Sequence, residues 1–85
     1  MSLAQIEYFV AVAHEGHVGR AASKLCVAQP AVSRQTRNLE DELGATLFVR
    51  TPRGMTSLPA GVTFLEHAEA ILGRVRTAKD ELRAR

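Results

Sequence analysis

Three histidines and one cysteine are the side chains of this 85-residue chain that could bind a metal or act in catalysis. His14 and His17 stand three residues apart, and Cys26 and His67 lie elsewhere in the sequence. A structural zinc site needs four ligands at recurrent spacings, and no second pair is present. Glycine-rich phosphate loops, nucleophile elbows and paired carboxylates are also missing. We therefore expect no metal, no cofactor and no enzymatic activity, and we expect Cys26 to be a small core residue.

Basic side chains point to a different chemistry, because they are concentrated in the middle of the chain. The formal net charge is only +2, but residues 18–39 carry Lys and Arg with no acid at all. Arg50 and Arg53 follow an acidic run at 40–42, which we expect to be a solvated helix end. Clustered positive charge is typical of a surface that binds phosphate groups. The alternative is a solvated basic face without a partner.

Length and composition favour one small helical domain. Hydrophobic residues make up 46% of the chain, but Ala is frequent and only 5% of residues are aromatic, which favours closely packed helices over a small core. The longest apolar run, residues 8–13, is far shorter than the roughly 20 residues that span a bilayer. A lone cysteine cannot form an internal disulfide, and no signal-peptide pattern is present. We expect a cytoplasmic protein that does not enter a membrane.

Two helices are expected in the first 25 residues. Ser2 and Gln5 have the spacing of a capping box, and apolar residues then recur at three- and four-residue steps until Gly16. A second helix is expected from Gly19 to Leu25, with two adjacent alanines on one side and Gly19 as its cap.

A third helix is expected to open at Gln29-Pro30 and to end at Gly44, since proline suits a first helical turn and glycine suits a helix end. No Ser, Thr, Asp or Asn stands directly before it, so its first amides are free to bind a phosphate. Ser33, Arg34 and Arg37 lie away from its apolar face. That apolar face consists of Val32, Thr36, Leu39 and Leu43. Helices 19–25 and 29–43 form the pattern of a helix-turn-helix.

The sequence then changes to two short strands, 47–50 and 55–58, around a turn that contains Pro52 and Arg53. A basic hairpin directly after a helix-turn-helix is a wing. We therefore expect a mainly α fold, a winged helix-turn-helix of three helices and a two-stranded wing over residues 1–58, followed by a long dimerisation linker helix over residues 59–85.

That long helix, of about 25 residues and about 38 Å, exceeds the about 27 Å width of the domain before it. It must overhang the domain, and its apolar stripe then needs a second chain to cover it. We expect a homodimer through this helix. The expected interface residues are Phe64, Ala68, Ile71, Leu72, Val75, Ala78 and Leu82.

The run GRAASKLCVAQPAVSRQTRNLEDELGATLFVRTPRG, followed by PAG and a long helix, resembles the N-terminal DNA-binding region of LysR-type transcriptional regulators. The resemblance covers nearly the entire chain. It implies sequence-specific binding of double-stranded DNA, with the third helix in the major groove and the wing near the minor groove. It also implies an antiparallel linker-helix dimer on an interrupted inverted-repeat operator. Full-length relatives continue into an effector-binding domain and usually form tetramers, so we expect this chain to be a DNA-binding fragment that lacks that domain.

Residue roles follow from this resemblance and from side-chain chemistry. Arginine and glutamine can make paired hydrogen bonds to base edges, whereas exposed arginines at the rim suit the DNA backbone. The expected base readers are Gln29, Pro30, Ser33 and Arg34, and the expected contacts to backbone or minor groove are Arg37, Arg50 and Arg53.

Four positions depart from the family pattern. Gly19 and Ala28 replace a frequent Thr and Ser, Thr36 stands where a larger apolar residue is common, and the order at 57–59 deprives the linker helix of its usual threonine cap. A second hypothesis is a helical protein–protein interaction module, in which the long helix pairs with another protein and the basic face is incidental.

Overall fold

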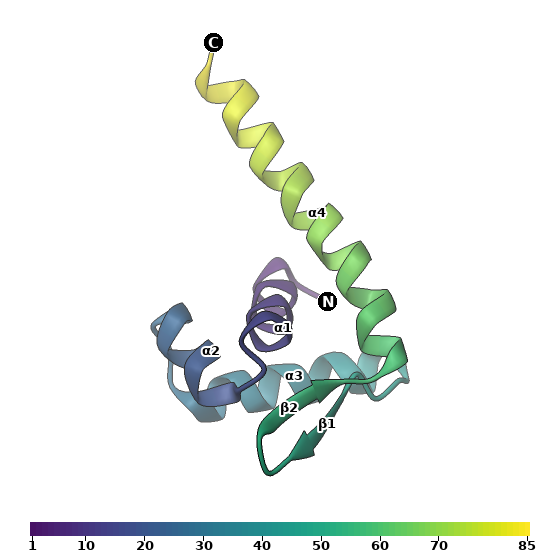
Figure 1. The fold of residues 1–85 in the computed structure, drawn as a ribbon. Coiled ribbons are helices and arrows are strands. Elements are labelled where there is room, and N and C mark those ends of the chain that lie inside the picture. Colours follow the sequence, from purple (N-terminus) through teal and green to yellow (C-terminus); the bar gives the residue numbers. More distant parts are fainter.

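A computed structural model describes all residues 1–85. The elements follow in the order α1 (Leu3–Glu15), α2 (Val18–Leu25), α3 (Gln29–Leu43), β1 (Phe48–Thr51), β2 (Gly54–Ser57) and α4 (Pro59–Arg83). The first three helices and the β1–β2 hairpin form a body, and α4 leaves that body as a long arm (Figure 1). The expectation of a mainly α winged helix-turn-helix with a long final helix is confirmed.

The starts of the first two helices are set by side-chain caps. Ser2 Oγ accepts a hydrogen bond from the Gln5 amide at 3.1 Å, and Gln5 Oε1 accepts one from the Ser2 amide at 3.3 Å, which confirms the capping box. Helix α2 begins one residue earlier than expected, because His17 is its cap and the His17 Nδ1 accepts from the Arg20 amide at 3.2 Å. The expectation that Gly19 caps α2 is therefore wrong.

Phe9 lies at the centre of the core. Its side chain is fully buried, and its ring lies 5.2 Å from that of Phe48 in β1 and 5.0 Å from that of Phe64 in α4. One side chain on α1 therefore joins the wing and the long helix. The small buried Ala21 and Ala22 on α2 leave room for the neighbouring helices to approach closely.

The wing is a two-stranded antiparallel hairpin in which Phe48 pairs with Ser57 and Thr51 pairs with Gly54. The Met55 amide donates to the Gly16 carbonyl at 2.9 Å, so the wing is attached to the corner between α1 and α2. At Gly54, where φ is +131°, a Cβ would overlap the Gly16 carbonyl oxygen. Only glycine allows so close an approach of the two backbones.

Helix α4 belongs to the body at its beginning and leaves it towards its end. Ala68 is fully buried and Phe64 is packed against the core, whereas residues 76–85 are all exposed. The molecule measures 48 × 26 × 19 Å, so the expected overhang is confirmed. The expected dimer interface needs a correction at Ala68, which is fully buried within its own chain and not available to a second one, whereas Phe64 is only partly buried there.

Two other side chains differ from expectation. Cys26 is exposed instead of buried, since it ends α2 in a left-handed conformation with φ at 59° that turns its side chain out of the core. Glu40 is not a freely solvated residue, because its Oε2 accepts from the amides of Leu47 at 2.7 Å and Phe48 at 3.4 Å. A carboxylate that caps the start of β1 could not be recognised from its place in an acidic run.

Thr36 gives a first prediction. Its hydroxyl is buried on the core side of α3 and has no hydrogen-bond partner. Because burial of an unpaired hydroxyl is unfavourable, Thr36→Val, which keeps the shape, should raise the free energy of unfolding by about 1 kcal/mol. Urea denaturation followed by circular dichroism measures this difference. Thr36→Ser, which keeps the hydroxyl and loses a methyl group, should lower stability; a valine variant less stable than wild type would contradict the assignment.

The cap of α2 gives a second prediction. His17→Ala removes the acceptor for the Arg20 amide and should lower the free energy of unfolding by about 1 kcal/mol. His17→Asn is the matched control, because asparagine is among the best residues at this position and should recover most of the loss. Equal stability of the alanine and asparagine variants, measured by thermal denaturation, would refute the capping role.

Candidate nucleic-acid interface

The outer face of α3 carries the polar and basic side chains that the sequence assigned to DNA. Gln29, Pro30, Arg34 and Arg37 are exposed, and Ser33 is half-buried beside them. The opposite face is closed by the buried side chains of Val32, Thr36 and Leu39. Because that inner face holds α3 in the body, the outer side chains are free of any structural contact within the core.

A hollow of about 200 Å³ separates the first turns of α2 and α3 from the wing. Gln29 lines it from α3, Arg50 and Arg53 line it from the wing, and His17 lines it from the cap of α2. A second hollow, of about 170 Å³, lies between α3 and the wing and is lined by Ser33, Arg37 and Arg50 among others. Arg50 lines both hollows, so the two form one continuous concave face.

The structure thus brings five of the seven expected DNA-binding residues together around this concave face, and places the other two, Pro30 and Arg34, on the exposed side of α3. The sequence did not identify His17 as a residue of this face. Its position lines the first hollow only because the wing docks on the corner between α1 and α2, and no local pattern in the sequence reveals that contact.

Positive charge predominates on this face, and its arginines are not paired with acidic side chains. None of the four arginines at 34, 37, 50 and 53 forms an ion pair; the ion pairs of the chain join Met1 to Glu42, His14 to Glu69 and Lys24 to Glu15. No acidic residue lines the first hollow. Glu40 lines the second, but its carboxylate is held by two backbone amides. The guanidinium groups are therefore available to an anionic ligand.

The start of α3 adds backbone donors to the same face. Its cap residue is Ala28, and no side chain there accepts a hydrogen bond from the first turn, as expected from the sequence. Pro30 has no amide proton and the Ala31 amide donates to the Ala28 carbonyl at 3.0 Å, so the first turn offers a negative group the Gln29 amide and the helix dipole. The open first turn of α3 and the wing arginines thus offer two kinds of donor to phosphate.

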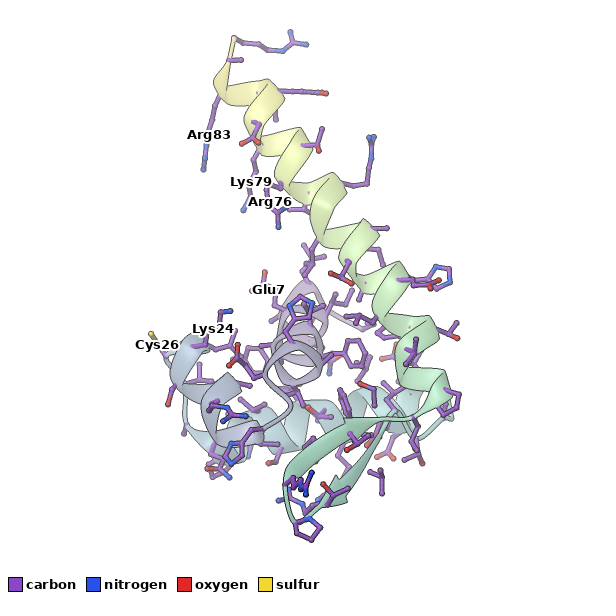
Figure 2. All side chains as sticks on the ribbon, viewed as in Figure 1. Glu7, Lys24, Cys26, Arg76, Lys79 and Arg83 are labelled. Carbon is purple, nitrogen blue, oxygen red and sulfur yellow. The ribbon has the colours of Figure 1, made fainter.

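The candidate metal ligands are dispersed. His14 pairs with Glu69 at 3.3 Å, His17 caps α2, and Cys26 lies on the surface near the end of α2, on the same side of the molecule as Lys24 (Figure 2). No three His, Cys, Asp or Glu side chains are grouped in a way that could hold a metal ion. None of the helices combines the length and the apolar character required to cross a membrane.

Known proteins are similar to this chain in sequence and in fold. A family model for bacterial regulatory helix-turn-helix proteins of the lysR family matches residues 3–62. The HTH-type transcriptional regulator TfdS of Cupriavidus pinatubonensis is 49% identical over 84 residues, which are 99% of this chain and 28% of that regulator. The chain therefore spans less than a third of the length of this relative.

Two solved DNA complexes have the same architecture. The crystal structure of the CbnR_DBD–DNA complex is 42% identical with a TM-score of 0.92, and covers 99% of this chain and 97% of that one. The BenM_DBD complex with catB site 1 DNA, from a regulator of Acinetobacter baylyi, is 40% identical with a TM-score of 0.94, and covers 99% of this chain and 94% of that one. With the family model matching well over half of its residues, the chain belongs to the LysR family of bacterial regulatory helix-turn-helix proteins.

Proposed function

We propose that this chain binds double-stranded DNA sequence-specifically, as the DNA-binding region of a LysR-type transcriptional regulator in the bacterial cytoplasm. The observation that carries the proposal is the concave face between α3 and the wing, which is lined by three exposed arginines, Arg37, Arg50 and Arg53, with Arg34 exposed beside it on α3. None of these four arginines forms an ion pair. The DNA complexes of CbnR and BenM, whose DNA-binding regions have the same fold, support it.

The proposed binding mode places α3 in the major groove, which is about 12 Å wide and admits a helix. Gln29 and Arg34 then read base edges by paired hydrogen bonds, and Pro30 and Ser33 contact the bases between them. Arg37, Arg50 and Arg53 contact the phosphates or the adjacent minor groove. Because the wing is fixed to the corner between α1 and α2, Arg53 and α3 reach the DNA as one rigid surface.

A dimer through α4 completes the proposal. Beyond Ala68, the apolar stripe of α4 is open: Ile71 is 38% exposed and Leu82 is 68% exposed. Leu72 and Val75 line a groove of about 250 Å³ beside α1, with Glu7 on one rim and Arg76 and Lys79 on the other (Figure 2). We propose that Ile71, Leu72, Val75, Ala78 and Leu82 pair with the same helix of a second copy.

Such a dimer presents two α3 helices related by a two-fold axis, so the proposed operator is an interrupted inverted repeat. The chain covers 28% of TfdS, and the remainder of that regulator has no counterpart in these residues. Effector binding and tetramer formation in a longer protein therefore belong to the proposal as expectations for the family.

Two arginine variants distinguish contacts to the DNA bases from contacts to the DNA phosphate backbone. Arg34→Ala should weaken binding to the preferred DNA by roughly 1 to 3 kcal/mol and reduce the discrimination between sequences. Arg53→Ala should weaken binding to all sequences alike and reduce the slope of log affinity against log salt by about one. Titrations of labelled duplexes at several salt concentrations measure both effects.

Arg83→Ala is the charge-matched control, because Arg83 lies near the far end of α4, away from α3 and the wing (Figure 2). It should leave base preference and salt slope as in wild type. If the variants at 34 and 53 both bind like wild type, the site assignment fails. If the wild-type chain binds no duplex even at low salt, the helical protein–protein interaction module becomes the better hypothesis.

The dimer gives a separate prediction. Ile71→Asp combined with Val75→Asp should convert the dimer to a monomer, because the two substitutions in each chain would bury four unpaired charges in an apolar helix pair. Light scattering measures the mass, and circular dichroism checks that the helices are retained. Val62→Asp is the control, since Val62 is an exposed apolar residue of α4 outside the stripe. An unchanged mass for the double variant would show that α4 does not form the interface.

A further inference from the structure

Helix α4 is joined to the body by a close contact between two backbones. Gly61, in the first turn of α4, is buried against the carbonyl group of Leu47, just before β1. A Cβ at Gly61 would lie well within 3.0 Å of the Leu47 carbonyl oxygen, so no other residue fits unless the backbones move apart. The same carbonyl accepts a hydrogen bond from the Leu58 amide at 2.9 Å. Leu47 therefore fixes both the cap and the first turn of α4.

Leu47 is itself held by the third helix. Its side chain is buried, and its amide donates to Glu40 Oε2 of α3 at 2.7 Å. Glu40 lies on the same helix as the proposed base readers, about two turns beyond Arg34. A continuous path of short contacts thus runs from α3 through Glu40 and Leu47 to Gly61 of α4. We call these three residues the α3–α4 joint.

We infer that the α3–α4 joint sets the angle between the DNA-reading helix and the dimerisation helix, and that Gly61 is thereby a positioning residue that determines the separation of the two half-sites. The inference rests on the proposed DNA-binding dimer. In such a dimer, the distance between the two α3 helices depends on how each body is attached to its α4. Neither Gly61 nor Glu40 needs to touch DNA to select the spacing.

The size of the effect can be estimated from the helix geometry. A side chain at Gly61 must move the Leu47 carbonyl and α4 apart by about 1 Å, taking 3.0 Å as the closest approach of a real Cβ. The buried Ala68 acts as the pivot, about 10 Å along the axis, and Arg83 lies about 22 Å beyond it. The far end therefore moves by about 2 Å. Two protomers together contribute about 4 Å, close to the 3.4 Å rise of one base pair.

The test compares two glycines of the same helix. Gly61→Ala introduces a methyl group against Leu47, whereas Gly73→Ala introduces the same group where nothing lies within 4 Å. Each chain is titrated against duplexes that carry two inverted copies of the half-site selected by the wild type, at separations that differ by single base pairs. A duplex with one half-site measures the contact of α3 and the wing alone.

For Gly61→Ala we expect a preferred separation that shifts by about one base pair, or the loss of any preference, with unchanged binding to the single half-site. Gly73→Ala should keep the wild-type separation. A folded, dimeric Gly61→Ala chain with the wild-type separation would overturn the inference. Failure of the wild type to bind any duplex would instead refute the proposed function on which the inference rests.

A second variant covers the case in which Gly61→Ala does not fold. Glu40→Ala releases the Leu47 amide without adding an atom to the contact, and should broaden the range of separations that bind well. Glu40→Gln retains an acceptor oxygen and should restore part of the preference. If Glu40→Ala binds with the narrow preference of wild type, the joint does not set the spacing, whatever the behaviour of the glycine variant.

Discussion

The packing of Phe9 between two other aromatic rings is the interaction on which the arrangement of this chain depends. Its ring lies about equally far from Phe48 of the wing and from Phe64 of α4. Only 13 of the 85 residues are buried, so the domain has few other contacts that could hold these elements in place. A chain this small buries a modest share of its surface, and its stability is correspondingly limited. Every element proposed to contact DNA or a second chain is therefore positioned by one shared core.

Because the small core holds α3 from its inner side, the outer face of α3 is free for recognition. Val32, Thr36 and Leu39 secure the helix from inside, and the arginines outside make no ion pair. Like charges held close together repel one another, which disfavours the free protein slightly. A polyanion relieves that repulsion and releases its own counterions. Exposed, unpaired arginines thus slightly destabilise the isolated fold and stabilise its complex with DNA.

Local patterns in the sequence predicted most of the elements. The capping box at Ser2, the proline at the start of α3 and the turn at Pro52-Arg53 each act within a few residues, so spacing alone reveals them. Most of the expected DNA-binding side chains also lie together around the concave face, because the wing follows α3 directly in the chain. The overhang of α4 followed from its length alone.

Contacts between distant segments could not be predicted in this way. The wing docks on Gly16 through Gly54, and Glu40 caps the start of β1, but neither residue type signals its partner. The stripe on α4 looked uniform in the sequence, although its first part, including Ala68, is covered by the body of the same chain. Periodicity shows that a face is apolar and does not show which surface covers it. The prediction that Cys26 is buried was wrong for a related reason, since its left-handed backbone turns the side chain outward.

Selection of bound duplexes from random DNA by the wild-type chain tests the central claim most directly. The proposed dimer predicts enrichment of two inverted half-sites separated by a constant interval, because two copies of α3 must meet the major groove on one side of the duplex. Salt should weaken the binding of all selected sequences. A pool that shows no enriched sequence, or a single half-site without its inverted partner, would contradict the account.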